Sequence, residues 1–288
     1  MIIKKIYIKV FKRIEGFKSH PLTHKDVGLA LYRYLKFNTI QKIYPKVRLY
    51  NWIDNLKFYA KIGDAGIVGN IYFKLSDYEE SMFLIRHLKK GELFVDVGSN
   101  VGHYSLLAAG ICDAEVVAIE PIPSTFSKLN KNVVLNKLAN KIQTFNIGIG
   151  EESSFLNFTT NKDVMNRVAQ EYDKEIIRVE VMPLDELLKD KTPVFLKIDV
   201  EGFEYFVLKG AKNVLANESL KYIIIEFNFS SSKFGHTNQE IFELLTANNF
   251  IPVRYNAVKK SISILKNYNT DKFNTIFIRN SEVINYND

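Results

Sequence analysis

The sequence predicts an α/β protein: an open, doubly wound sheet, mostly parallel with an antiparallel edge strand, plus an N-terminal extension of helices and short strands. From residue 93 onwards, short apolar runs typical of buried strands alternate with amphipathic helical stretches. A glycine-containing loop follows the first of these runs. The next apolar run and two later ones carry an acidic residue at or near their ends, which places carboxylates at the edge where such sheets bind ligands.

The 288 residues leave room for a catalytic domain with an extension, and we predict a boundary between residues 1–75 and residues 76–288. A single cysteine, Cys112, excludes an internal disulfide and favours a reducing compartment, so we expect a cytoplasmic protein. No apolar run approaches the roughly 20 residues that cross a bilayer. Lysines interrupt the apolar N-terminal residues, which argues against a secretory signal.

Positive charge is concentrated near the N-terminus. Residues 1–60 hold thirteen Lys/Arg and three Asp/Glu, a net charge of +10, which leaves −3 for the rest of a chain whose total is +7. The presumed catalytic fold is therefore not basic, which argues against nucleic acid as its partner. Residues 1–15 have helical apolar spacing and predict a helix packed on the body. The alternative is peripheral contact of this helix with the inner membrane surface. Nothing indicates the oligomeric state.

Several elements are expected before the central loop. Residues 24–44 predict a second helix, rich in aromatic residues. Residues 47–62 and 67–75 alternate enough to predict two or three strands. Ser76, with Glu79 three residues later, predicts the N-cap of a helix that ends before Gly91.

The stretch 93–106 predicts a strand, a glycine loop and the start of a helix. Gly98 and Gly102 let the backbone turn and approach a ligand closely. Asn100 ties the loop to itself or caps the helix. Asp96 is expected to point its carboxylate into the ligand crevice.

The next strand, 115–120, ends in Glu120, an acid that can accept hydrogen bonds from both ribose hydroxyls of a bound nucleotide. Pro121 begins an apolar ledge suited to a purine, and Ser124 is the predicted N-cap of the helix that follows. Residues 141–147 predict a third strand, with Asn146 as a candidate contact on the adenine side.

The later elements complete the sheet. We expect strands at 153–160, 176–181, 194–199, 221–227, 250–255 and 274–278, and helices at 184–188, from 203 to near 210, and at 238–248. The long polar connection 161–174 is either a lid over the acceptor site or a mobile tip. Asp199 ends one strand, Glu201 and Glu204 follow on the turn, and Glu226 lies on the next strand.

Three segments together resemble the FkbM family of S-adenosylmethionine-dependent methyltransferases: 94–102, 119–121 and 196–204. The first, with the order Asp-x-Gly-x-Asn-x-Gly, is similar to motif I of class I methyltransferases. The last contains Ile-Asp-Val-Glu-Gly-Phe-Glu and is the most specific of the three. The resemblance covers about residues 70–280. Ser99 departs from the alanine common in the family, and its small size makes this harmless.

The resemblance implies a class I methyltransferase sheet of the Rossmann-like type with seven strands, S-adenosyl-L-methionine as cofactor, and methylation of a hydroxyl oxygen, commonly on a sugar or polyketide. The residues expected around the cofactor are Asp96, Gly98, Asn100, Gly102, Glu120, Pro121, Asn146 and Asp199. The predicted function is an O-methyltransferase whose acceptor is a hydroxyl on a sugar of a surface glycan or a related natural product.

The acceptor side is predicted from its carboxylates. A sugar hydroxyl needs a base within hydrogen-bond reach, and clustered carboxylates raise one another's pKa towards the useful range. Asp199 or Glu201 is the favoured base, and His103 is the alternative. We predict no metal. The competing interpretation uses Asp199, Glu201 and Glu226 as ligands of a divalent ion, although no tight ligand spacing supports it.

Other classes of function remain as alternatives. An RNA methyltransferase would use the same cofactor site and grip phosphates with the basic extension. The acidic turn after Asp199 would repel such a chain. A nicotinamide-dependent oxidoreductase would be expected to have a third glycine in the loop. A non-catalytic binding module would not need the acceptor acids.

Overall fold

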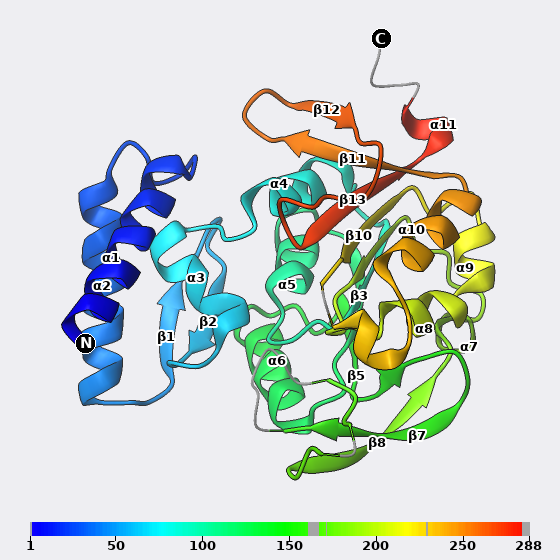
Figure 1. Cartoon of the computed structure of the whole chain (residues 1–288), viewed down its shortest axis with the longest axis horizontal. Helices are drawn as coiled ribbons and strands as arrows, with labels where there is room; N and C mark the ends of the chain where they lie inside the picture. Colours follow the sequence, from blue (N-terminus) through cyan, green and yellow to red (C-terminus); the bar gives the residue numbers. More distant parts are fainter. Residues whose placement is uncertain (1, 161–166, 171, 229, 284–288) are drawn as a thin grey trace.

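The computed structural model describes residues 2–160, 167–170, 172–228 and 230–283. At its centre lies an eight-stranded sheet in the order β12-β11-β13-β10-β9-β3-β4-β5 (Figure 1). Its strands are β3 (Leu93–Val97), β4 (Glu115–Ile119), β5 (Ile142–Phe145), β9 (Phe195–Ile198), β10 (Tyr222–Glu226), β11 (Phe250–Asn256), β12 (Ser261–Ile264) and β13 (Asn274–Arg279).

The pairing confirms the predicted fold class. Strands β5, β4, β3, β9 and β10 are parallel, and β13, β11 and β12 continue the sheet in antiparallel pairs. In the described residues the main sheet has eight strands, where the family resemblance implied seven. The additional strand is β12, which pairs with β11 in an exposed hairpin at the edge of the sheet. It has no apolar run, so the sequence did not predict it.

Helices cover both faces of this sheet, and successive residues of each strand point to opposite faces. Phe94 and Phe195 pack with α4 (Tyr78–His87), α5 (His103–Gly110) and α6 (Pro123–Leu135). Val95 and Leu196 pack with α7 (Leu184–Leu188), α8 (Glu204–Lys209), α9 (Lys212–Ala216) and α10 (Asn238–Ala247). A short helix, α11 (Asn280–Val283), follows β13. Because helices cover both faces, a ligand can reach the sheet at the carboxyl ends of its parallel strands. We call this end of the sheet its open edge.

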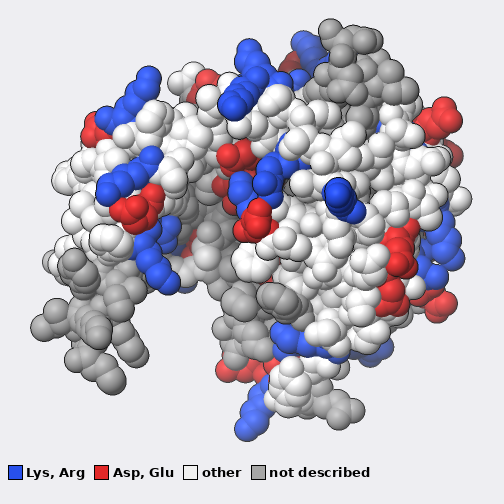
Figure 2. Space-filling model, turned by 45° about the horizontal axis from the view of Figure 1, so that its top comes forward, with Lys and Arg blue, Asp and Glu red and all other residues white. Residues whose placement is uncertain are grey.

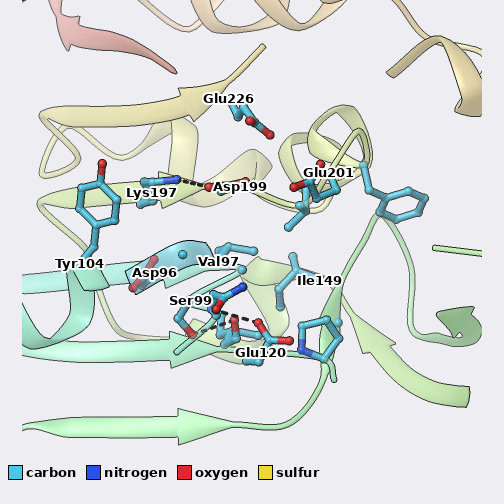
Figure 3. A pocket seen from close by; sticks show the side chains of 18 of the residues that line it. Asp96, Val97, Ser99, Tyr104, Glu120, Ile149, Lys197, Asp199, Glu201 and Glu226 are labelled. Atoms are coloured by element: carbon cyan, nitrogen blue, oxygen red, sulfur yellow. Dashed lines mark hydrogen bonds and ion pairs between the residues drawn. The ribbon is translucent and has the colours of Figure 1, made fainter. Parts of the chain in front are cut away.

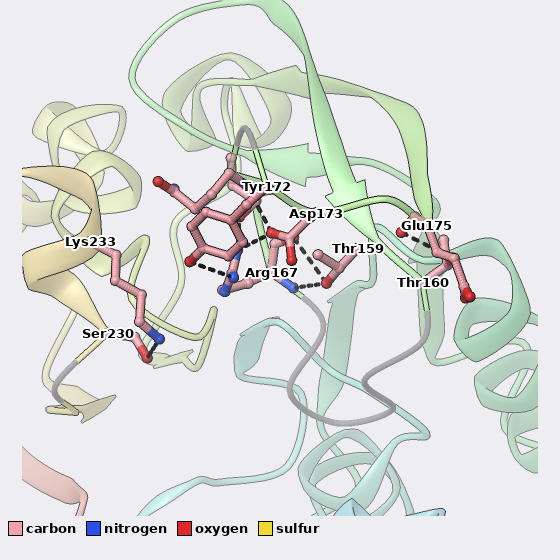
Figure 4. A network of polar contacts seen from close by, with 10 residues as sticks. Thr159, Thr160, Arg167, Tyr172, Asp173, Glu175, Ser230 and Lys233 are labelled. Atoms are coloured by element: carbon pink, nitrogen blue, oxygen red, sulfur yellow. Dashed lines mark hydrogen bonds and ion pairs between the residues drawn. The ribbon is translucent and has the colours of Figure 1, made fainter.

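A smaller sheet of β6 (Gly148–Ile149), β8 (Ile176–Met182) and β7 (Ser154–Thr159) lies beside this edge. The predicted antiparallel pair is confirmed as β7 and β8. Part of the connection between them, 161–166 and 171, lies outside the described residues, so the lid interpretation stays a prediction. In the described part, the nearly buried Arg167 and Asp173 form an ion pair of 2.9 Å, and the Arg167 guanidinium also donates to the Tyr172 hydroxyl (Figure 4).

The N-terminal part consists of α1 (Ile2–Ser19), α2 (Val27–Ile43), the β1 (Arg48–Asn51) and β2 (Lys57–Ala60) hairpin, and α3 (Ala65–Phe73). The two strands predicted within 47–62 are confirmed. The strand predicted at 67–75 is wrong, because that segment is the helix α3. Its residues are apolar on almost all sides, packing both on α1–α2 and on the body, so the alternation there was accidental.

Two predicted helix starts are also wrong in detail. The helix α4 begins at Tyr78, so Asp77 and not Ser76 is the residue before its first turn. Asp77 has a φ of 47°, and its side chain makes no capping hydrogen bond. Ser76 instead donates to the Asn70 side chain. The helix α6 begins at Pro123 and is preceded by Ile122, so Ser124 is not its cap.

The N-terminal part is tied to the body by side-chain hydrogen bonds. Asn132 on α6 and Asn136, the residue that caps its C-terminus, accept from the backbone of β2 at 2.8 Å each, and Lys128 pairs with Asp64 at 2.6 Å. Among the described helices, none is both long and apolar enough to span a bilayer. The domain boundary at residue 75 stays a prediction.

Candidate active site

The end of β3 and the loop after it hold the first set of predicted residues. Asp96 is buried, and its Oδ2 accepts a 2.5 Å hydrogen bond from the Ser105 hydroxyl. Burial raises the pKa of Asp96 to about 6. Gly98 has a φ of 80°, and a Cβ there would lie 1.8 Å from the carbonyl oxygen of Asp199, so only glycine fits. The loop is therefore pressed against the end of β9.

Asn100 and Gly102 shape this loop in different ways. Asn100 has a φ of 50°, and its side-chain oxygen accepts from the backbone of Val101 at 2.8 Å, which confirms that it ties the loop to itself. Gly102 has a φ of 99°, and a Cβ there would lie 2.8 Å from Leu129. Gly102 does not line the cavity, so its role is the close packing of α5 on α6.

Glu120, at the end of β4, is the second buried acid. Its two carboxylate oxygens accept from the backbone amides of Ile122 and Asn100, each at 3.0 Å (Figure 3). Burial raises the pKa of Glu120 to about 7. A carboxylate offers about four acceptor positions, so two remain free for the hydroxyls of a ribose.

Asn146 lies outside this arrangement. Its side chain is exposed and does not line the cavity. Its amide donates to the carbonyl oxygens of Glu120 and Pro121 at 2.8 and 3.0 Å. Asn146 therefore stabilises the backbone around Glu120. It does not line the cavity, where the predicted contact with adenine would be made.

These elements surround a cavity of about 260 Å³ at the open edge of the sheet (Figure 3). Of the predicted residues, Asp96, Gly98, Asn100, His103, Glu120, Pro121, Asp199 and Glu201 line it, together with Ala65 and Gly66 from the N-terminal part. Its charged lining comprises six carboxyl groups and one ammonium group: Asp77, Asp96, Glu120, Asp199, Glu201, Glu226 and Lys197. Such a lining favours a ligand that carries positive charge.

Lys197 is the residue that the sequence-based prediction omitted. Its side chain is 2% exposed, and its Nζ lies 2.9 Å from Asp199 Oδ2. It pairs in register with Asp96 on the neighbouring strand and lies 5.1 Å from the centre of the Tyr104 ring. Burial opposes its charge, but Asp199 and Asp96 together raise the pKa of Lys197. A lysine inside an otherwise apolar strand was the available signal, because a buried charge requires a partner.

The turn after β9 and the end of β10 carry the acceptor-side acids. Carboxylate oxygens of Asp199, Glu201 and Glu226 lie within 4.8 Å of one another, although the sequence places them on two strands and a turn (Figure 3). Burial, and then the charge of Asp199, raise the pKa of Glu201 to about 7 and that of Glu226 to about 9. A pKa near 7 lets Glu201 exchange a proton near neutral pH, as a base for a hydroxyl must, whereas Glu226 keeps its proton there.

The turn itself is built to present Glu201. Glu201 has a φ of 56° and Gly202 a φ of 106°, and a Cβ on Gly202 would lie 2.6 Å from the Ser230 backbone. The buried Glu204 accepts from the amides of Val200 and Gly202 at 3.2 and 3.0 Å, so it holds the turn closed. Glu204 is thus structural, and of the two glutamates on the turn Glu201 is the one that lines the cavity.

His103 has a different environment from the one expected of a base. Its Nδ1 lies 2.9 Å from the Asn70 amide nitrogen, and its Nε2 lies 2.9 Å from the Ser81 hydroxyl. Burial lowers the pKa of His103 to about 3. Both ring nitrogens are occupied by partners within the fold, so the contacts of His103 are those of a structural residue.

The cofactor implied by the sequence fits this cavity. S-adenosylmethionine carries a sulfonium, an ammonium and a ribose, and the cavity offers an excess of carboxylates and a ribose acceptor in Glu120. The doubly wound sheet, the Asp96 loop and Glu120 at the next strand define a class I methyltransferase that uses S-adenosylmethionine.

Comparison with known proteins then gives the family. Residues 96–252, more than half of the chain, match the family described as "Methyltransferase FkbM domain". The chain belongs to this family of methyltransferases. The resemblance stated from the three motifs is thereby confirmed.

Individual relatives are distant. The chain is 27% identical over 148 residues to the hexuronic acid methyltransferase AglP of Haloferax volcanii, covering 50% of this chain and 59% of that protein. It is 25% identical over 195 residues to methyltransferase sdnD of Sordaria araneosa, covering 54% and 73%. A third match, 35% identical over 80 residues, is a tRNA(Phe) (4-demethylwyosine(37)-C(7)) aminocarboxypropyltransferase of Pyrococcus horikoshii, covering 28% of this chain and 29% of that protein.

Solved structures are more distant still. TrmK of M. capricolum, in complex with S-adenosyl-homocysteine, aligns with a TM-score of 0.38 at 11% identity and covers 69% of this chain and 66% of its own. A precorrin-6y C5,15-methyltransferase of Geobacter metallireducens aligns with a TM-score of 0.39 at 11% identity, covering 69% and 85%.

Proposed function

We propose that this protein is an O-methyltransferase that methylates a hydroxyl group on a sugar of a glycan. The observation that carries the proposal is the group of three carboxylates, Asp199, Glu201 and Glu226, within 4.8 Å of one another beside the cofactor loop. Such a group accepts hydrogen bonds from neighbouring hydroxyls and can take up a proton. The likeness to a hexuronic acid methyltransferase supports a sugar as the acceptor.

In this proposal the chain has three tasks. Asp96, Gly98 and Glu120 hold the methyl donor, whose sulfonium supplies a carbon open to in-line attack when it is bound. Lys197 fixes Asp199 through their 2.9 Å ion pair. Glu201 accepts the proton from the acceptor hydroxyl as the oxygen attacks, because its pKa near 7 suits a base at neutral pH. The remaining rate acceleration comes from aligning the donor with the acceptor and from excluding water.

The RNA alternative has less support. The basic residues that would hold phosphates belong to the N-terminal part, whereas the edge around Glu201 and Glu226 is acidic. A phosphate chain entering there would meet like charges. Among the described residues on the face shown in Figure 2, acidic and basic side chains are interspersed.

The proposal is tested with a deletion strain. Surface and lipid-linked glycans from the strain that lacks the gene are compared with the parent by mass spectrometry. We expect a sugar that has lost one CH₂ increment. Purified protein and isotope-labelled S-adenosylmethionine should restore the methyl group to the glycan from the deletion strain. Methyl transfer to RNA, with unchanged glycans, would refute the proposal.

A further inference from the structure

The helix α2 has two apolar faces, and the fold uses only one of them. Ala30, Tyr34, Phe37 and Gln41 are buried against the rest of the N-terminal part. The opposite face carries Leu29, Tyr32, Leu35 and Ile43 at helical spacing, with exposures of 40%, 57%, 45% and 61%. A helix that is apolar on both sides is normally covered on both sides.

The same kind of surface continues beyond the helix. Tyr44, Val47 and Leu49 follow directly and are 66%, 52% and 49% exposed. We call the face of α2 together with these residues the outer face. In Figure 1, α1 and α2 lie at the end of the molecule farthest from the main sheet, and α3 lies between them and the body. The outer face therefore has no described part of this chain available to cover it.

Lysines accompany these apolar side chains. Lys25, Lys36, Lys42 and Lys46 are all exposed, and Asp26 is the only acid between residues 24 and 49. The Lys36 ammonium lies 5.5 Å from the centre of the exposed Tyr32 ring. Apolar and aromatic side chains interspersed with lysines are the pattern of helices that lie in the headgroup region of anionic bilayers.

The charge distribution favours an anionic lipid surface over a second copy of the chain as the partner of the outer face. Residues 1–60 carry a net charge of +10, so two outer faces brought together would repel each other. An anionic lipid surface attracts the same charge, while the rest of the chain, at −3, is not attracted. Attraction confined to one end would orient the molecule on the membrane.

We propose that the outer face of α2 docks the protein on an anionic membrane surface. The docking residues are thus placed on α2 and the segment after it, whereas the alternative interpretation of the sequence placed membrane contact in residues 1–15. On α1, Phe17 is fully buried and the Arg13 guanidinium lies over the Tyr34 and Tyr72 rings, so this part of α1 is occupied in packing. This inference does not depend on the acceptor.

The test is vesicle flotation of the full chain. Phosphatidylcholine vesicles are compared with vesicles that also contain phosphatidylglycerol. We expect binding to the anionic vesicles only, and weaker binding as salt increases. Leu35→Glu and Ile43→Glu should each lower the partition coefficient about tenfold, because each places a carboxylate in the contact. Lys36→Gln/Lys42→Gln should lower it about as much.

The matched controls are Val258→Glu and Ile264→Glu, which alter side chains that are 69% and 59% exposed, in the turn between β11 and β12 and on the edge strand β12. They should bind vesicles like the parent. Thermal unfolding and S-adenosylmethionine binding should be unchanged in all the variants, which excludes misfolding. Absence of vesicle binding, or an equal loss in the controls, would overturn the proposal. So would a dimer in sedimentation that Leu35→Glu dissociates, since the outer face would then join two copies.

Discussion

The two sides of the cavity hold their carboxylates in opposite ways. On the donor side, Asp96 and Glu120 are 2% and 5% exposed, and each is fixed by a hydroxyl or by backbone amides. On the acceptor side, Glu201 and Glu226 are partly exposed and lie beside Asp199, the partner of Lys197. Fixed acids suit a cofactor that is the same in every cycle. Crowded, partly exposed acids suit proton exchange with a substrate.

The largest effect is expected on the acceptor side. Glu201→Gln keeps the shape of the side chain and removes the base, so methyl transfer should fall about 100-fold or more. The dissociation constant of S-adenosylmethionine should stay within about threefold, because Glu201 lies across the cavity from Glu120. Isotope transfer to glycan from the deletion strain and calorimetry measure the two quantities. Unchanged turnover would remove Glu201 from the mechanism.

On the donor side, Asp96→Ala or Glu120→Ala should weaken S-adenosylmethionine binding about tenfold or more, a loss of about 1.4 kcal/mol each. Both carboxylates are buried and positioned by the fold, so each contributes to binding without rearranging. Calorimetry on the purified variants checks this. Retained affinity in both variants, or tight binding of a nicotinamide nucleotide to the parent, would contradict the assignment of the donor side.

The pH dependence of binding distinguishes the two sides further. Burial raises the pKa of Glu120 from 4.5 to about 7, so the free protein is stabilised below about pH 4.5 and loses this contribution as the pH rises through 7. The bound ribose requires the ionised carboxylate. Binding must therefore release a proton below pH 7, and affinity should rise about 25-fold from about pH 5.5 to about pH 7.5, as the ionised fraction of Glu120 grows from about 0.03 to about 0.76.

Glu120→Gln is the control for this dependence, because it cannot ionise and should flatten most of the slope. The Glu201→Gln variant should keep the slope of the parent. A slope that survives Glu120→Gln unchanged would show that another acid, such as Asp96, titrates on binding.

The smallest effect is expected for Asn146→Ala. This side chain is exposed and supports Glu120 only through hydrogen bonds to carbonyl oxygens. Removing them should weaken S-adenosylmethionine binding less than about threefold, against about tenfold for Glu120→Ala. An equal loss in the two variants would restore the direct adenine contact predicted for Asn146.

Sequence reasoning was most successful where a residue type has one physical reason to be present. The acid-ended strands and the positive-φ glycine Gly98 were found because buried parallel strands and tight turns constrain their residues strongly. It was least successful where tertiary packing determines the conformation of a segment or the role of a residue. The segment 67–75 is a helix because several partners surround it, and Lys197 acquires its importance from neighbours on other strands. Neither kind of contact is visible along a single chain.

The contact between Gly98 and the Asp199 carbonyl has a practical consequence for redesign. The turn that presents the acceptor acids rests directly on the loop that receives the donor, with no space for even a methyl group between them. A change of backbone in the turn would therefore disturb donor binding as well. Altered acceptor selectivity is better sought in the peripheral walls of the cavity, such as Ala65 and Gly66, which come from the N-terminal part and lie apart from this contact.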